Sequence, residues 1–327
     1  MALDHVPLGP TGTSVTEIAF GTWRFGRETD AGGFEVDRER AHELLDAYAD
    51  AGGNFIDTAD VYGDGRSEEW IGDWLAGRDR EDFVIASKIY WPTREGDPNG
   101  RGIGRKHLRR QIDLILDRLG TDYLDLLYTH RFDEGTPVEE FTRTLDGFVR
   151  DGKVNYLGTS VFDPNAWKTA KANEIADRRG YEPFTVSQPR FNLVDREIEG
   201  NYLDMCEAYD IGVCPWSPLG GGFLTGKYGR EEIPEGTRGD ESDRFADRYL
   251  TEGNFETLSV VREVAGETGA TPAQVSLAWL CRHPAVTAPI VGARTVDQLD
   301  ENLAAAEVEL SDDQFERLAE ARPGEDE

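Results

Sequence analysis

One stretch of the chain reads Asn54-Phe55-Ile56-Asp57-Thr58-Ala59-Asp60-Val61-Tyr62-Gly63. Its apolar start predicts a short strand, and a carboxylate and a phenol follow where that strand would end. Ser67 is expected to cap a helix over residues 68–75, which carries Trp70, Ile71, Trp74 and Leu75 on one stripe. The stretch therefore predicts a strand–helix unit with polar groups at the carboxyl end of the strand and with Trp70 and Trp74 in the core.

The same pattern recurs along nearly the whole chain. Strands are expected to begin near eight positions: Glu17, Asn54, Phe83, Leu124, Val154, Thr185, Gly212 and Val286. From the second to the seventh, successive starts lie 27 to 41 residues apart, which is the length that one strand–helix unit requires. Residues 104–119 show the helical stripe again. Strands that alternate with helices predict a parallel sheet, and eight such units close a (β/α)8 barrel, also called a TIM barrel.

A doubly wound α/β sheet is the alternative fold. In that fold, the glycines that bind a dinucleotide follow a strand at the start of a βαβ unit. The glycine run of this chain, Gly220-Gly221-Gly222, instead comes after the seventh expected strand. The barrel is therefore the preferred prediction.

Three segments depart from simple repetition. Residues 4–15, with Gly9-Pro10-Thr11-Gly12 at the centre, predict a hairpin that closes the bottom of the barrel. After the seventh strand, an expected loop over residues 220–249 precedes helices at 255–267 and 272–281, the second opened by a capping box at Thr271. Residues 311–321 predict a capped terminal helix. No domain boundary is evident, so residues 1–327 are interpreted as a single α/β barrel domain.

Composition excludes several classes of function. The chain has 327 residues, of which 38% are hydrophobic, and its formal net charge is −29. Such a charge opposes binding to nucleic acid or to anionic lipid. The sequence offers no membrane span, signal peptide or metal-ligand spacing, and its three scattered cysteines fit a reducing compartment. We therefore expect a cytoplasmic protein without nucleic-acid or membrane partners, and self-association into a homo-oligomer is left open.

The basic residues are unevenly divided, with 6 Lys against 29 Arg. An acid-rich, lysine-poor composition is typical of proteins from salt-loving microbes. Concentrated salt would screen the repulsion within such a surface, since the Debye length falls to about 3 Å at 1 M. We therefore expect a halophilic protein whose stability falls in dilute buffer. A merely acidic soluble protein is the alternative.

Four polar side chains are expected where barrel strands end. Asp57 and Tyr62 follow the second strand, Lys88 ends the third and His130 ends the fourth. A charge near a barrel interior is costly unless it is paired, and Asp57 with Lys88 would make such a pair. The ammonium would also favour the phenolate of Tyr62, so we expect it to lower the pKa of that phenol toward the working range of a general acid.

These residues belong to a wider set of motifs. The others are Phe20-Gly21-Thr22-Trp23, Ser87-Lys88, Gly158-Thr159-Ser160, Trp216-Ser217-Pro218-Leu219 and Val291-Gly292-Ala293-Arg294. With them the chain resembles the aldo-keto reductases, and within that family the branch that includes potassium-channel β-subunits. Those subunits typically carry Asn at the position of His130, and the histidine of this chain matches the active reductases.

The resemblance implies reduction of an aldehyde or ketone, a small-molecule carbonyl substrate, with NADPH, although NADH is also open. Tyr62 would protonate the carbonyl oxygen as hydride arrives from the nicotinamide. Lys88, held by Asp57, would tune Tyr62, and His130 would orient the carbonyl. No metal is needed. Trp23, Trp91 and Phe132 are candidates for the walls of the substrate pocket, although they would equally suit loop packing.

The resemblance also implies the cofactor contacts. Ser160 and Gln188 would hold the carboxamide, Trp216 would stack on the nicotinamide, and Trp23 would lie beside it. The pyrophosphate would contact Ser217, Leu219, Gly221 and Lys227, with Arg238 as a further phosphate ligand. Beyond Gly292, Arg294 would bind the adenosine 2′-phosphate. Gln298, Glu301 and Asn302 would lie near the adenine.

Two other functions remain as alternatives. In the first, the barrel binds nicotinamide cofactor and senses its redox state for a partner, with little turnover. In the second, it is a glycoside hydrolase that uses two of the many carboxylates across about 5–10 Å. The abundance of acids is the only support for the hydrolase.

Overall fold

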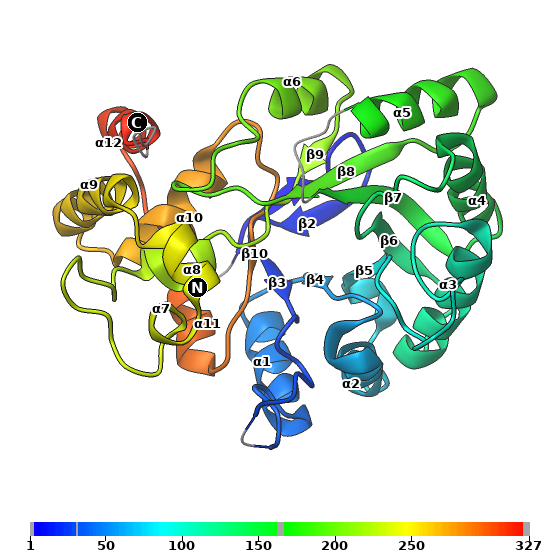
Figure 1. The fold of residues 1–327 in the computed structure, drawn as a ribbon, viewed down its shortest axis with the longest axis horizontal. Coiled ribbons are helices and arrows are strands. Elements are labelled where there is room, and N and C mark those ends of the chain that lie inside the picture. Colours follow the sequence, from blue (N-terminus) through cyan, green and yellow to red (C-terminus); the bar gives the residue numbers. More distant parts are fainter. Residues whose placement is uncertain (1–2, 31, 162–166, 323–327) are drawn as a thin grey trace.

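Eight parallel strands form one sheet in the computed structural model, which describes residues 3–30, 32–161 and 167–322 (Figure 1). Neighbouring strands pair in the order β10-β3-β4-β5-β6-β7-β8-β9. Their bounds are β3 Ala19–Gly21, β4 Phe55–Asp57, β5 Val84–Ile89, β6 Leu124–Thr129, β7 Val154–Val161, β8 Phe184–Pro189, β9 Gly212–Val213 and β10 Ile290–Val291. This is the predicted (β/α)8 architecture.

Two backbone hydrogen bonds between residues 213–215 and residues 287–290, the segments that contain or adjoin β9 and β10, close the ring. The amide of Thr287 donates to the Val213 carbonyl at 2.7 Å, and the amide of Ile290 donates to the Pro215 carbonyl at 2.9 Å. The eighth strand was expected to begin near Val286, but Val286 forms only an isolated bridge to Val213. Its regular pairing begins at Ile290, which lies beside Ala19 of β3.

Helices surround the strands (Figure 1). Those between successive strands are α1 Arg38–Asp50, α2 Arg66–Leu75, α3 Arg105–Leu119, α4 Val138–Arg150, α5 Trp167–Arg179 and α6 Asn201–Ala208. After β9 and at the carboxyl end come α7 Arg238–Glu241, α8 Asp243–Tyr249, α9 Glu252–Thr268, α10 Pro272–Arg282, α11 Val296–Leu303 and α12 Asp312–Glu320. The capping boxes expected at Thr271 and Ser311 are present. No helix in the described ranges is long and apolar enough to cross a membrane.

Two local predictions are wrong. The expected loop over residues 220–249 contains a 3-10 turn, η3 Gly220–Thr225, and the short helices α7 and α8. Ser67 does not cap α2, because that helix begins at Arg66, two residues earlier than expected, after the left-handed Gly65. The Ser67 hydroxyl instead lies 2.7 Å from that of Thr22 and 2.9 Å from that of Thr58.

An amino-terminal hairpin closes one end of the barrel. Strands β1 His5–Pro7 and β2 Ser14–Thr16 pair antiparallel, and Leu8 and Val15 are fully buried among the residues that fill the barrel interior. At the tip, a Cβ on Gly9 would lie 2.6 Å from the Thr185 carbonyl oxygen, at the start of β8. The hairpin therefore fits closely against the amino ends of the strands and leaves the carboxyl ends open.

Candidate active site

A cavity of about 970 Å³ opens at the carboxyl ends of the strands, where (β/α)8 barrels carry their active sites. Ligand pockets typically hold roughly 300–1,000 Å³, so this one is large. The predicted residues that line it are Trp23, Asp57, Tyr62, Trp91, His130, Ser160, Gln188, Trp216, Ser217, Leu219, Gly221, Lys227, Arg238, Gly292, Arg294, Gln298, Glu301 and Asn302. Apart from Phe132, the predicted set therefore converges on one cavity, and Lys88 is buried in contact with it through Asp57 and Tyr62.

A buried ion pair forms the floor of one end of the cavity. Lys88 Nζ donates to Asp57 Oδ1 and, at 2.8 Å, to the Thr58 carbonyl. The same ammonium lies 3.2 Å from the Tyr62 hydroxyl. The ring of His130 faces Tyr62 edge-on, with ring centroids 5.9 Å apart. The structure thus brings together the carboxylate, phenol, ammonium and imidazole that the strand ends predicted.

Strand pairing explains why Lys88 reaches Asp57. Strands β4 and β5 are parallel, with Asp57 beside Ala86. Alternate residues of a strand share a face, so Lys88 points with Ala86 into the barrel. Ser87 points the other way, toward α2, where its hydroxyl donates to Glu68 at 2.5 Å. The ammonium is therefore fixed inside the barrel beside the last residue of β4.

A sharp turn after β4 presents Tyr62 to the cavity. Gly63 has a φ of 57°, and a Cβ there would lie 2.5 Å from the Phe25 carbonyl oxygen. Another residue would strain this turn and collide with the loop after β3, so the turn requires glycine. Arg66 stabilises the arrangement, since its Nη1 donates at 3.1 Å to the carbonyls of both Gly26 and Gly63.

Burial acts on both members of the Asp57–Lys88 pair. Burial opposes the charge of Lys88, but Asp57 and Tyr62 together raise the pKa of the ammonium above its usual value. Burial raises the pKa of the Asp57 carboxyl, while hydrogen bonds from Lys88 and, at 2.8 Å, from Gln188 Nε2 oppose that rise. Lys88 is therefore a fixed positive charge beside the phenol.

The pKa of Tyr62 differs in direction from the expectation. Burial raises the pKa of the phenol above its usual value, and the Lys88 ammonium offsets only part of that rise. The negative charge of Asp57 adds to it. The sequence did not show how deeply Tyr62 is buried. Here the effect of burial on its pKa is larger than the opposing effect of the Lys88 ammonium. Tyr62 therefore keeps its proton in this structure, which is the state that a general acid needs.

His130 is a neutral imidazole in this site. Burial lowers its pKa well below the usual value, and the Lys88 charge lowers it further. The ring of Trp91 packs edge-on against it, with centroids 6.1 Å apart. A neutral ring has one N–H donor and one acceptor nitrogen, so His130 can offer a hydrogen bond without adding a second positive charge.

Side chains at the ends of β7, β8 and β9 line the same end of the cavity. Gln188 Nε2 donates to Asp57 Oδ2, and the Ser160 hydroxyl donates to the Gln188 carbonyl at 3.2 Å. Trp216 is half-buried and follows β9, and the Arg190 guanidinium stacks on its indole, 5.5 Å from the ring centroid. The polar side chains of Ser160 and Gln188 and the indole of Trp216 therefore line the end of the cavity that contains Tyr62.

The segment 217–227, which we call the strap, forms one wall of the cavity. Its first residue, Ser217, has a φ of 57°, and its hydroxyl accepts from the Gly221 amide at 3.1 Å. The absence of side chains at Gly221 and Gly222 leaves room for cations: ideal Cβ atoms there would lie 3.3 Å from Arg238 Nη1 and 3.5 Å from Lys227 Nζ. The glycines of the strap therefore lie next to two cations, Lys227 at its end and Arg238 at the start of α7.

Asp195 anchors the strap to the barrel. This carboxylate is buried and accepts from Asn192 Nδ2 and from the Tyr249 hydroxyl, both at 2.8 Å, and from Arg248 Nε at 2.7 Å. Asn192 Nδ2 also donates to the Ser217 carbonyl at 2.9 Å. The network therefore connects the loop after β8, helix α8 and the first residue of the strap.

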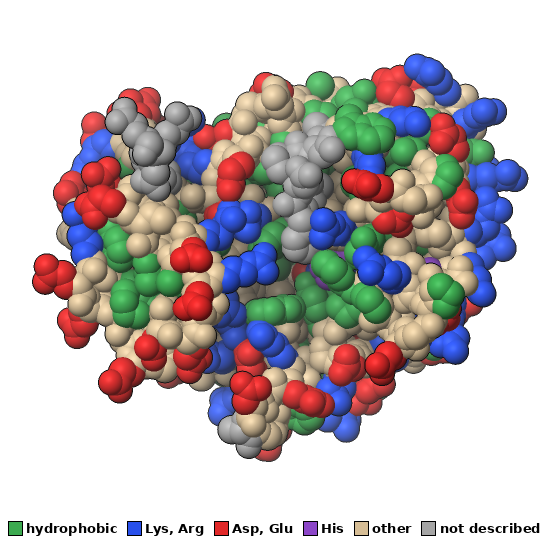
Figure 2. Space-filling view, in the orientation of Figure 1, with side chains coloured by type: hydrophobic (Ala, Val, Ile, Leu, Met, Phe, Trp, Pro, Cys, Tyr) green, Lys and Arg blue, Asp and Glu red, His purple; other side chains and the backbone are tan. Residues whose placement is uncertain are grey.

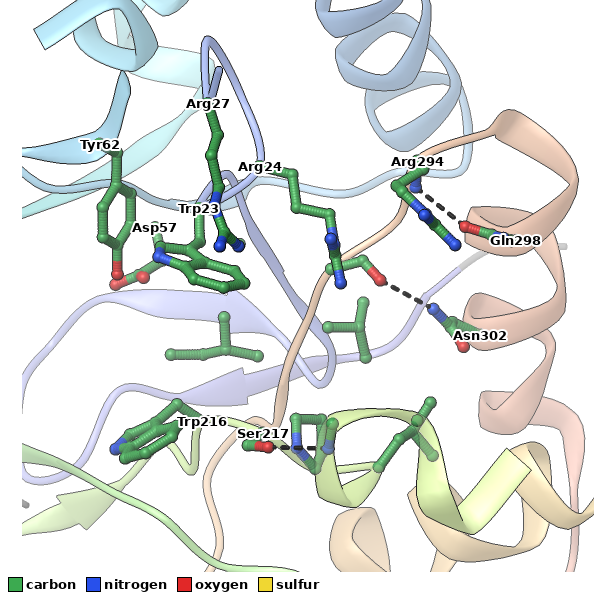
Figure 3. A pocket seen from close by; sticks show the side chains of 18 of the residues that line it. Trp23, Arg24, Arg27, Asp57, Tyr62, Trp216, Ser217, Arg294, Gln298 and Asn302 are labelled. Carbon is green, nitrogen blue, oxygen red and sulfur yellow. Dashed lines mark hydrogen bonds between the residues drawn. The ribbon is translucent and has the colours of Figure 1, made fainter. Parts of the chain in front are cut away.

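The far end of the cavity is formed by the start of α11 (Figure 3). The Arg294 amide donates to Gln298 Oε1 at 3.0 Å, and Asn302 Nδ2 donates to the Gly292 carbonyl at 3.5 Å. Thr295 caps the helix, accepting from the Gln298 amide at 3.3 Å. The Arg294 side chain remains exposed beside the cavity.

Sequence reasoning missed several cavity residues, among them two arginines, and misplaced Phe132. Arg24 and Arg27, in the loop after β3, line the cavity with Trp23; their position directly beyond a barrel strand was the available signal. Phe132 was a candidate for the substrate wall, but it packs against the rings of Phe141 and Phe184 and is not among the cavity-lining residues. The apolar contact with helix α4 accounts for that position.

Comparison with known proteins agrees with this geometry. The family model described as "Aldo/keto reductase family" matches residues 17–323. A probable voltage-gated potassium channel subunit beta of Oryza sativa is 34% identical over 94% of this chain and 92% of its own length. A norsolorinic acid reductase of Emericella nidulans is 36% identical over 98% and 81%. An uncharacterized oxidoreductase of Bacillus subtilis is 34% identical over 98% and 97%. With this match across the barrel and its cavity, the chain belongs to the aldo/keto reductase family.

Proposed function

We propose that this protein reduces small-molecule aldehydes or ketones to alcohols with NADPH, using Tyr62 as the general acid. The observation that carries the proposal is the 3.2 Å contact between the Tyr62 hydroxyl and Lys88 Nζ, at the floor of a large cavity. Oxidoreductases among the relatives support this class of reaction. Family membership favours it over the glycoside hydrolase alternative.

The donor set of the cavity suits a nicotinamide dinucleotide. Ser160 and Gln188 would hold the carboxamide, and Trp216 would stack on the ring. Lys227 and Arg238 would meet the pyrophosphate. Arg294, at the start of α11, would meet a 2′-phosphate, which favours NADPH over NADH. When bound, the reduced nicotinamide supplies the hydride.

The chain's own residues would supply the proton and the orientation. Tyr62 would transfer its phenolic proton to the carbonyl oxygen of the substrate, leaving a phenolate 3.2 Å from the Lys88 ammonium. That charge stabilises the phenolate and so lowers the barrier to proton transfer. Asp57 keeps Lys88 charged and in place. His130, as a neutral donor, would hydrogen-bond the same carbonyl oxygen, and Trp23 and Trp91 would wall the substrate.

A turnover assay tests this proposal. The full chain, kept in molar salt, is mixed with NADPH or NADH and a panel of aliphatic and aromatic aldehydes and ketones, and the loss of reduced cofactor is followed. We expect turnover with NADPH to exceed turnover with NADH, and an alcohol to form for each NADPH consumed. Absence of NADPH binding would refute the proposal.

A regulatory role is the second candidate, because several relatives are named as probable or putative potassium channel β-subunits. In that case the barrel would bind the cofactor tightly and turn over little. The same assay separates the two: tight NADPH binding with no consumption across the panel would favour the regulatory role.

A further inference from the structure

The loop after β3 brings two arginines to the cavity from the side opposite the strap. In Figure 3, Arg24, Arg27 and Trp23 descend into the cavity from one wall, while Trp216 and Ser217 lie on the other. Arg24 lies between Trp23 and Arg294 in this view, so it faces the middle of the cavity rather than either end.

One carboxylate holds both arginines of this loop. Arg24 Nη1 donates to Glu35 Oε2, and Arg27 Nη1 lies 3.2 Å from Glu35 Oε1. A single negative charge cannot neutralise two guanidinium groups. A guanidinium also has five N–H donors, and the contact with Glu35 occupies only one of those of Arg24. Glu35 therefore orients Arg24 and leaves donors for another anion.

Arginine guanidinium groups from both walls of the cavity lie close to the ring of Trp23. The Cζ atoms of Arg24 and Arg27 lie 5.5 Å and 4.3 Å from the centroid of its ring. From the other wall, Cζ of Arg238 lies 5.4 Å from the same ring. Lys227, Arg238 and Arg294 form no ion pair with any part of the chain that the structure describes. The cavity is therefore rich in positive charge.

This charge is opposite in sign to that of the whole protein. The chain has a net charge of −29, yet Figure 2 shows Lys and Arg side chains around the central hollow and Asp and Glu mainly farther out. Burial lowers the pKa of the Arg24 guanidinium, and repulsion from Arg294 and Arg27 lowers it further against the effect of Glu35. An anion between the two walls would relieve this repulsion.

We propose that Arg24 binds the pyrophosphate of the cofactor from the wall opposite the strap, so that Arg24 and Arg238 hold the two phosphates from two sides. The inference rests on the proposed function, since it assumes a nicotinamide dinucleotide in the cavity. A diphosphate has oxygens on both sides, and a planar guanidinium can donate to two of them at once. Glu35 is the positioning residue that keeps Arg24 directed at them.

The test compares the affinities of two nucleotides that share a pyrophosphate. NADPH and NADH are titrated into the full-length wild type and into Arg24→Gln at one fixed salt concentration, and their fluorescence gives Kd. Loss of a charged hydrogen bond of this kind weakens binding by roughly 10- to 100-fold. We expect both nucleotides to lose affinity by the same factor, so the ratio of the two Kd values stays at its wild-type value.

Two further variants complete the experiment. Arg38→Gln is the matched control, because this exposed arginine on α1 pairs with Asp73 outside the cavity and its loss changes the net charge equally. It should leave both Kd values unchanged. Arg24→Lys keeps the positive charge but lacks the planar guanidinium with its paired N–H donors, so it should give an intermediate loss of affinity. This variant keeps the test valid if Arg24→Gln folds poorly, which circular dichroism would reveal.

The outcomes separate this inference from the proposed function. Wild-type affinity for both nucleotides in Arg24→Gln and Arg24→Lys would overturn the role of Arg24 and leave the reductase intact. A loss confined to NADPH would place Arg24 on the 2′-phosphate and would also overturn the inference. A wild type that binds neither nucleotide would refute the proposed function together with this inference.

Discussion

The buried Glu68 makes stability depend on pH in a direction opposite to that of most carboxylates. Its side chain is fully buried in α2, accepts from the Ser87 hydroxyl at 2.5 Å and lies 3.2 Å from Arg118 Nε. Burial raises the pKa of Glu68 from 4.5 to about 7, although Arg118 and Ser87 oppose the rise. The folded protein therefore holds this proton more tightly than the unfolded chain does.

The raised pKa of Glu68 determines the sign and the size of the pH dependence of stability. Between pH 4.5 and pH 7, the folded state binds more protons than the unfolded state, so the free energy of unfolding falls as pH rises. The contribution is fully present below pH 4.5 and is lost above pH 7. At 1.36 kcal/mol for each pKa unit, the change amounts to about 3 kcal/mol.

The perturbation is Glu68→Gln, which is neutral at every pH. We expect the variant to gain about 3 kcal/mol relative to the wild type as pH rises from 4.5 to above 7, because the wild type alone must ionise a buried carboxyl. Urea unfolding in molar salt, followed by tryptophan fluorescence at several pH values, measures the difference. Glu256→Gln, at an exposed position on α9, is the control and should give a constant difference. A constant difference for Glu68→Gln as well would refute the reasoning.

Three further predictions concern catalysis, cofactor choice and salt. Tyr62→Phe should lower turnover by roughly 10²- to 10⁴-fold with NADPH affinity nearly unchanged, as measured by steady-state kinetics and titration; wild-type turnover would eliminate Tyr62 as the acid. Arg294→Ala should weaken NADPH binding by roughly 10- to 100-fold and NADH binding far less, and equal losses would contradict the assignment to the 2′-phosphate. Because the net charge is −29, the Tm in dilute buffer should lie below that in molar salt, and equal Tm values would count against this expectation.

The order of strands and helices was accessible from sequence because each element carries its own periodicity. Parallel pairing then placed Asp57 and Lys88 on adjacent strands, so their contact followed from topology rather than from any local motif. The hydrogen bonds of Ser67, in contrast, could not be predicted from local sequence. A serine before an apolar stripe usually caps a helix, but here it bonds to Thr22 and Thr58 on two other segments.

Loop conformation and desolvation account for the rest of what sequence did not show. Arg24 and Arg27 carry no periodic signal, and their shared partner Glu35 becomes evident only once the loop is folded. Residues 220–249 contain short helices because Asp195 and the aromatic rings around Phe245 order that segment through tertiary contacts. The raised pKa of Tyr62 likewise depends on burial, which a strand pattern does not quantify.

The hairpin that seals the amino ends of the strands has a kinetic consequence. Leu8 and Val15 fill the bottom of the barrel, so, in the part of the chain that the structure describes, ligands reach the cavity from the carboxyl ends of the strands. In the proposed binding mode, a dinucleotide would extend from Trp216 to Asn302, and a substrate walled by Trp23 and Trp91 would close over its nicotinamide. The carbonyl compound would then have to arrive second and the alcohol depart first. Product-inhibition patterns should accordingly show a compulsory sequence, with the oxidised nucleotide competitive only against its reduced form.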